Sequence, residues 1–246
     1  MDWERELYNE EEKPLDRMVE GYSNTAIFRS IAFVGDSLSS GEFEIWDENG
    51  KPKYYDMYEY SFGQYIARKN GLKAYNFSRG GMTAQKYLES YAESNGFWDR
   101  EKACQAYVIA LGVCDILGQG MEIPVFLRYY AGIVKRYKEI SPGAKFFFVT
   151  LPKYTTPGCE EKTLAVREAL YSLAENFEDA YVIDLYQYGP VHDERFRDKF
   201  YLYGHRNPSG YILTAKIIDS YIDYIVRHNP EEFRRIGLVC KENKIF

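Results

Sequence analysis

Five short apolar runs recur along the chain, and longer stretches of mixed polar and apolar residues separate them. The runs are rich in β-branched and aromatic residues and are apolar nearly throughout, which is typical of strands buried on both faces. They are SIAFVG (30–35), LKAYNF (72–77), AYVIALG (106–112), AKFFFVTL (144–151) and AYVIDLY (180–186). The pattern therefore predicts five strands of a mostly parallel sheet.

Apolar residues at helical spacing fill four of the intervening and following stretches. The last of these opens with Asn207 and Pro208, a favourable N-cap followed by a residue that suits the first helical turn. The predicted helices span residues 58–70, 124–140, 160–177 and 208–228. Because strands alternate with helices over short connections, we expect βαβ units with right-handed crossovers and an α/β fold.

Length and composition limit the class of protein. The chain has 246 residues, of which 46% are hydrophobic, and this is enough for one substantial core. We expect a single domain over 1–246, with an N-terminal extension (1–29) and a C-terminal tail (229–246). The net charge of −6 argues against a nucleic-acid partner. The acidic N-terminus lacks a signal peptide's apolar segment, and no apolar run reaches membrane-spanning length. These features predict a cytoplasmic protein without a membrane partner.

Cysteine and histidine are few and widely spaced. The four cysteines form no CxxC pair, so we expect reduced thiols. The three histidines are too scattered for a zinc site. The sequence therefore predicts neither a metal nor a cofactor, and it does not indicate an oligomeric state.

The residues that follow the predicted strands carry the candidate chemistry, because ligands of an open parallel sheet bind at the carboxyl ends of its strands. Ser37 follows the first strand, Gly81 the second and Cys114 the third, and His205 lies beyond the fifth. Ser37 is the candidate nucleophile and His205 the candidate base. The backbone N–H groups of Ser37 and Gly81 are candidate oxyanion donors. This set predicts acyl transfer.

Each of these residues also has a simpler interpretation. Gly-Asp-Ser can be only a turn that starts a helix, and His205 can be a loop histidine, with His192 as a rival base. Cys114 can be a reactive thiol or a small buried residue behind the serine. We favour the buried residue, since Ser37 already occupies the nucleophile position. The cluster is more informative than its members, because its parts follow the strands in order.

Four segments resemble, in order, the sequence blocks of the GDSL or SGNH hydrolases, a family of esterases, lipases and acylhydrolases. They are GDSLSSG (35–41), NFSRGGMT (76–83), GVCD (112–115) and LYGHRNPSGY (202–211). The resemblance covers about residues 30–228. It implies a three-layer α/β/α sandwich with a five-stranded, mostly parallel, flavodoxin-like sheet, and catalysis without a cofactor.

Cys114 departs from the family pattern in the third block, where the family has an asparagine that donates to the oxyanion. A thiol is a weak donor beside an amide. We therefore expect the oxyanion hole to depend on the backbone groups of Ser37 and Gly81.

Leu202 departs from the pattern in the last block, where the family has the acid that orients the histidine. Our first choice for a substitute is the backbone carbonyl of Leu202, which would accept the Nδ1–H of His205 and leave a Ser-His dyad. Asp184 and Asp198 are alternative acids. A third alternative is that no group orients the histidine and catalysis is lost.

These features together predict a serine hydrolase that cleaves small acyl or O-acetyl esters through an acyl-enzyme on Ser37, with His205 as base. The tyrosine-rich segment 45–60 follows the nucleophile and would suit an acetylated carbohydrate if it walls the pocket. The alternative function is a ligand-binding protein that keeps the fold and has lost the chemistry. An acyltransferase is a variant of the first prediction.

Overall fold

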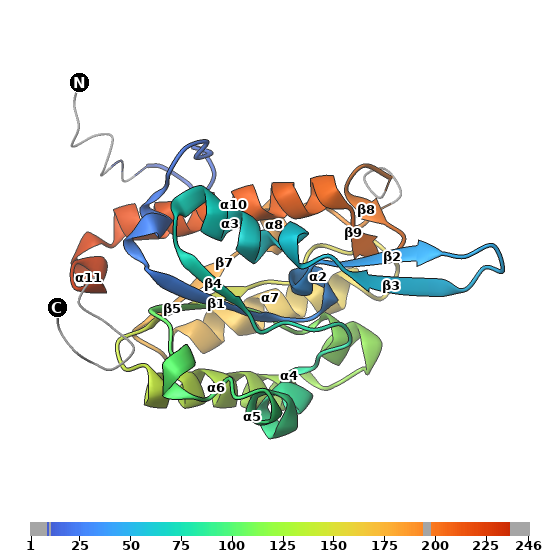
Figure 1. Cartoon of the computed structure of the whole chain (residues 1–246), viewed down its shortest axis with the longest axis horizontal. Coiled ribbons are helices and arrows are strands. Elements are labelled where there is room, and N and C mark those ends of the chain that lie inside the picture. The colour runs from blue at the N-terminus through green and yellow to red at the C-terminus, as the bar shows by residue number, and fades with distance from the viewer. Residues whose placement is uncertain (1–8, 10, 194–197, 237–246) are drawn as a thin grey trace.

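The central sheet of the computed structural model has five parallel strands (Figure 1). The structure describes residue 9 and residues 11–193 and 198–236. The strand order is β4-β1-β5-β6-β7, which is the flavodoxin-like order. The strands are β1 (Ser30–Gly35), β4 (Lys73–Asn76), β5 (Ala106–Ala110), β6 (Lys145–Val149) and β7 (Ala180–Ile183). All five predicted strands are confirmed.

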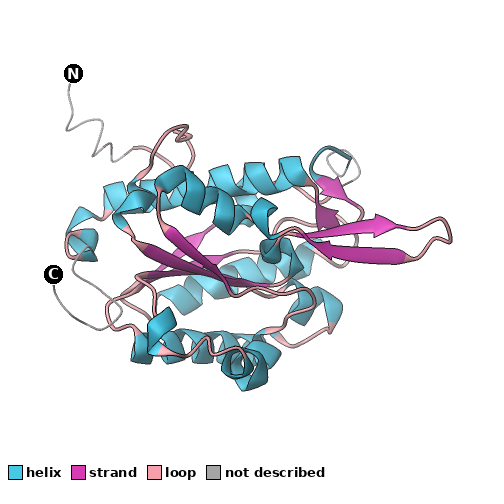
Figure 2. Cartoon of the chain, in the orientation of Figure 1, coloured by secondary structure: helices cyan, strands magenta, loops and turns pink. Residues whose placement is uncertain are grey.

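Helices cover both faces of this sheet (Figure 2). The long ones are α3 (Phe62–Asn70), α6 (Ile123–Ile140), α7 (Glu160–Ala174) and α10 (Pro208–His228), close to their predicted ranges. As predicted, Asn207 caps α10, and its Oδ1 accepts the N–H of Gly210 at 2.8 Å. Within the described residues, no helix is both long and apolar enough to cross a membrane. The shorter helices and 3₁₀ or π turns (η) are η1 (Asn24–Ile27), α2 (Ser37–Ser40), η2 (Tyr58–Tyr60), α4 (Ala84–Lys86), η3 (Tyr87–Tyr91), α5 (Ala92–Ser94), η4 (Arg100–Lys102), η5 (Val113–Gly118), α8 (Leu185–Tyr188) and α11 (Pro230–Phe233).

Alternating side chains of the strands enter two hydrophobic cores, one on each face of the sheet. From β1, Ala32 and Val34 pack in the core shared with α6 and α7. Ile31 and Phe33 pack in the core shared with α3 and α10. Large buried aromatic side chains fill much of both cores. The three-layer α/β/α sandwich is therefore confirmed.

A β-hairpin projects from the carboxyl edge of the sheet and was not predicted (Figure 1). It pairs β2 (Glu42–Trp46) with β3 (Pro52–Asp56) in antiparallel register. The sequence carries a signal for it, an Asn-Gly turn at 49–50 with Gly50 at φ +68°, as tight hairpin turns require. The exposed strands of this hairpin lack the continuous apolar run of a buried strand, so the pattern that predicts the central sheet does not predict them. A second, shorter hairpin pairs β8 (Tyr201–Leu202) with β9 (His205–Arg206).

The segments outside the predicted family region pack on the body of the molecule. Glu12 of the N-terminal extension accepts a bidentate ion pair from Arg227 of α10 at 2.6 and 2.9 Å. In the C-terminal tail, Phe233 and Ile236 are buried in the core beside α10. Gln105 holds the tail there, because its Nε2 donates to the Ile236 carbonyl at 2.9 Å.

Candidate active site

Ser37 is the first residue of α2, in a tight turn that directly follows β1. The Asp36 carboxylate caps the helix, since its Oδ1 accepts the N–H of Leu38 at 2.9 Å. Gly35 lets the turn close, because a Cβ there would overlap the Ser39 side chain. The turn therefore presents the serine at the carboxyl edge of the sheet, and the Asp36 cap braces it.

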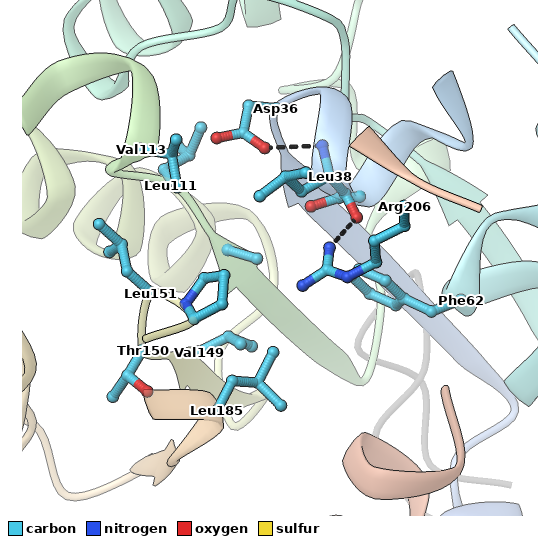
Figure 3. Close-up of a pocket in the computed structure, with 13 residues that line it drawn as sticks. Asp36, Leu38, Phe62, Leu111, Val113, Val149, Thr150, Leu151, Leu185 and Arg206 are labelled. Carbon is cyan, nitrogen blue, oxygen red and sulfur yellow. Dashed lines mark hydrogen bonds between the residues drawn. The ribbon is translucent and has the colours of Figure 1, made fainter. Parts of the chain in front are cut away.

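Arg206 and Tyr211, which follow the candidate base in the sequence, both contact this turn, and Figure 3 shows the contact of Arg206. The buried Arg206 donates through Nη1 to the carbonyl of Leu38 at 2.5 Å. The hydroxyl of Tyr211, in the first turn of α10, lies 2.8 Å from the Ser37 carbonyl and 2.9 Å from the Glu42 carbonyl. Arg206 and Asp36 line a small, mostly apolar cavity behind the turn, and Ser37 is not among its lining residues. These contacts attach the nucleophile turn to the segment that carries the histidine.

His205 lies in the β8–β9 hairpin and pairs with a carboxylate that the sequence analysis did not identify. Its Nδ1 is 2.7 Å from Oε2 of Glu44, which comes from β2. Gly204 N–H also donates to this oxygen at 3.1 Å, and Trp46 Nε1 donates to the other oxygen at 2.8 Å. Glu44 thus occupies the place of a triad acid, held by three donors.

This pairing overturns the prediction that the Leu202 carbonyl orients His205. Leu202 and His205 are opposite each other in the short β8–β9 ladder, and the imidazole extends from that ladder toward β2. The alternative acids, Asp184 and Asp198, do not contact His205 in the described structure. Asp184 is buried and is held by Thr150, Arg167 and Tyr171, at 3.2, 2.7 and 3.2 Å. Asp198 is exposed, and no described contact joins it to His205.

A second carboxylate lies at the other nitrogen of the same imidazole. Oε1 of Glu42 is 3.3 Å from His205 Nε2. Glu42 and Glu44 are two positions apart on β2 and therefore point to the same face of the hairpin. Within the described part of the chain, no hydrogen bond joins Ser37 Oγ to His205. The imidazole is bracketed by carboxylates on both sides.

The two carboxylates control the charge of the imidazole. Burial disfavours the charged ring, but the hydrogen bonds and charges of Glu42 and Glu44 outweigh burial and raise the pKa of His205 above its ordinary value. Burial also acts against the charged form of Glu44, but the bonds from His205, Trp46 and Gly204 lower its pKa. Glu44 is therefore ionised wherever His205 titrates.

Gly81 lies in the loop after β4 with φ +68°, a left-handed conformation that favours glycine. A Cβ at this position would meet open space, so the backbone conformation rather than crowding requires the glycine. The same loop is tied to the loop after β5, because Oδ1 of Asp115 accepts the Ala84 N–H at 2.8 Å. Asp115 thus joins the two loops at this edge of the sheet.

Cys114 lies in η5 with its thiol directed toward Asp36, at 3.9 Å from Sγ to Oδ2. Burial, followed by the charges of Asp36, Asp115 and Glu42, raises the pKa of Cys114 to about 12. The thiol is therefore protonated at physiological pH, which agrees with the interpretation of Cys114 as a packing residue rather than a nucleophile.

His192, the rival base, lies among aromatic rings rather than beside the carboxylates that contact His205. Its ring packs against the rings of Tyr154 and Tyr201, each at a centroid distance of 4.7 Å. Its backbone N–H donates to the carbonyl of Lys153 at 2.8 Å. Among the described residues, no group of three or more His, Cys, Asp or Glu side chains is arranged to hold a metal ion.

The structure is thus an α/β/α sandwich of the flavodoxin-like class, with Ser37 directly after its first strand. The family model of the GDSL-like lipases and acylhydrolases matches residues 33–213, so the chain belongs to this family. No curated protein matches the sequence.

Solved structures of low sequence identity share the fold. A family two carbohydrate esterase from Clostridium thermocellum, in complex with cellohexaose, is 16% identical with a TM-score of 0.61, over 88% of this chain and 67% of that one. The psychrotrophic esterase EstA from Pseudoalteromonas is 14% identical with a TM-score of 0.59, over 80% and 98% of the two chains. A lipolytic-type protein of the G-D-S-L family from Desulfitobacterium hafniense is 16% identical with a TM-score of 0.58, over 78% and 99%. With the family match, these neighbours support a hydrolase of ester bonds.

Proposed function

We propose that the protein is a serine esterase that hydrolyses small carboxylic esters through an acyl-enzyme on Ser37. The observation that carries this proposal is the 2.7 Å contact between His205 Nδ1 and Glu44 Oε2. It supplies a carboxylate that this chain lacks at position 202, where the family pattern has its acid. A triad acid fixes the tautomer of the histidine and stabilises its cation.

In the proposed reaction, Ser37 Oγ attacks the ester carbonyl while His205 Nε2 takes the hydroxyl proton. Glu44 stabilises the imidazolium that forms. The N–H groups of Ser37 and Gly81 stabilise the oxyanion of the tetrahedral intermediate. His205 then donates its proton to the leaving alcohol. Water attacks the acyl-enzyme by the same route, and this releases the acid and restores the serine.

Exposed aromatic rings around His205 support an acetylated carbohydrate as the substrate. The ring of Tyr54 lies 5.5 Å from the imidazole, and Trp46 lies 5.4 Å from Tyr203. These three side chains are 54%, 46% and 48% exposed, so they offer apolar faces on which a sugar ring can pack. The carbohydrate esterase among the structural neighbours, solved with cellohexaose, points to the same class.

Hydrolysis of p-nitrophenyl acetate and of acetylated oligosaccharides tests the proposal. We expect turnover by the natural protein and a loss of ~10³-fold or more in Ser37→Ala and His205→Ala. Ser90→Ala, which removes an exposed hydroxyl bonded only to Lys86 in its own helix, is the matched control and should keep full activity. If the natural protein and Ser37→Ala are equally inactive on a broad ester panel, the ligand-binding alternative replaces the esterase. Transfer to added alcohols in place of water would identify an acyltransferase.

A further inference from the structure

Of the two carboxylates that contact the imidazole, Glu42 has no role in the proposed reaction. Its Oε1 is 3.3 Å from His205 Nε2, and its side chain is only 15% exposed. The carboxylate also lies against the loop after β4, since a Cβ on Gly80 would overlap it. Its charge reaches the Cys114 thiol in the loop after β5. Glu42 therefore lies among the loops that converge on the nucleophile.

The position of this carboxylate determines the protonation of the imidazole. An ionised carboxylate stabilises a proton on the nitrogen beside it, so the 3.3 Å ion-pair contact favours a proton on Nε2. The contact with Glu44 requires a proton on Nδ1. With both contacts made, His205 carries two protons and is a cation. A cationic imidazole cannot accept the proton of Ser37, so this arrangement is a resting form rather than the reacting one.

We propose that Glu42 is a positioning residue that holds His205 in an inactive form with a carboxylate at each ring nitrogen, and that the ester substrate displaces the Glu42 carboxylate from Nε2 before the serine reacts. This inference rests on the proposed function of Ser37 and His205. Displacement leaves the Glu44 contact intact. Nε2 then loses its proton to solvent and is free to accept that of Ser37.

The other described charged and titratable groups around His205 do not form an ion pair with the imidazole, which leaves Glu42 and Glu44 to hold its charge. From the cap of α2, the charge of Asp36 interacts with that of His205. The guanidinium of Arg206 interacts with the charge of Asp36 and donates to the Leu38 carbonyl. Tyr54 from β3 contributes a neutral ring, and the hydroxyl of Tyr211 from α10 bonds only backbone carbonyls. Glu42 and Glu44 are the only described carboxylates in ion-pair contact with the imidazole.

The pH dependence of kcat/KM in Glu42→Gln tests the proposal. Removing one carboxylate from a contact with the imidazole should move the acidic limb of the profile to lower pH by about one unit or more. At a pH below both limbs, the variant should then be about tenfold faster than the natural protein. Glu48→Gln, which removes an exposed carboxylate from the turn of the same hairpin, is the matched control and should leave the limb in place.

A direct titration of His205 by NMR keeps the test independent of activity and of the proposed function. The chain has three histidines, so the signal missing from His205→Ala assigns the resonance. A lower His205 pKa in Glu42→Gln supports the proposal, even if no ester is turned over and the esterase assignment fails. An unchanged His205 pKa, or an activity loss without movement of the limb, overturns it. Thermal unfolding of each variant verifies that the fold is intact.

Discussion

Replacement of Glu44 by glutamine is the most direct test of how His205 is activated. The carboxylate accepts three hydrogen bonds, from His205 Nδ1 at 2.7 Å, Trp46 Nε1 at 2.8 Å and Gly204 N–H at 3.1 Å. Glutamine offers one oxygen and one amide nitrogen in the same space. Its oxygen can face His205 and Gly204, with the nitrogen then facing the half-exposed Trp46, whose N–H can turn to water. This orientation keeps the tautomer of His205 and removes only the charge.

The magnitude follows from the charge that is lost. An opposite charge in contact raises the pKa of a histidine by about 1–3 units, which is about 1.4–4 kcal/mol of stabilisation of the imidazolium. The imidazolium forms in the transition state of acylation, so kcat/KM should fall by ~10- to 10³-fold. If the amide nitrogen instead faces Nδ1, the wrong tautomer results and the loss should approach ~10⁴-fold.

The assay is hydrolysis of p-nitrophenyl acetate over a range of pH, with Glu48→Gln as the charge control on the same hairpin. A loss in Glu44→Gln should persist at every pH at which the carboxylate is ionised. The reasoning would be refuted if Glu44→Gln retained activity within about twofold while Asp184→Asn or Asp198→Asn lost it. The acid would then be Asp184 or Asp198, and the contact at 2.7 Å would have no catalytic role.

Three further predictions concern the turn and the thiol beside the candidate base. Burial, opposed by the hydrogen bond from the Leu38 N–H, raises the pKa of Asp36 from 3.8 to about 6. The folded state therefore binds this proton more tightly than the unfolded state does. The resulting stabilisation is lost as the pH rises from about 4 to about 6. Asp36→Asn keeps the cap and should increase the free energy of unfolding by up to about 3 kcal/mol at pH 7.5, with no gain at pH 4, as followed by urea titration at both values. Tyr211→Phe removes the hydroxyl that bonds the Ser37 and Glu42 carbonyls and should cost about 1–3 kcal/mol of stability; an unchanged melting temperature would show that these carbonyls find other donors. Cys114, with its pKa raised to about 12, should resist iodoacetamide in the folded protein at pH 8 and react after denaturation; rapid native alkylation, detected by mass spectrometry, would contradict its assignment as a packing residue.

The sheet could be predicted from the sequence because each strand is buried on both faces. Phe146, Phe147 and Phe148 of β6 are all fully buried, for example, and such a strand appears as a continuous apolar run. The same reasoning located Ser37, Gly81 and Cys114, since the ends of parallel strands meet at one edge whatever the details of the loops. The exposed β2–β3 hairpin has no such run, and its strands depend on pairing with each other rather than on burial.

The role of Glu44 could not be predicted from sequence spacing, because its contact with His205 joins distant parts of the chain. Glu44 and His205 are 161 positions apart and meet only when the β2–β3 and β8–β9 hairpins pack together. The acid lies in the β2–β3 hairpin, so it is not among the residues close to His205 in the sequence. Glu42 and Glu44 share one face of β2, so the hairpin that supplies the acid at Nδ1 also brings a carboxylate to Nε2. The departure at Leu202 and the restraint by Glu42 are thus two consequences of moving the acid from the histidine loop to a strand beside the nucleophile.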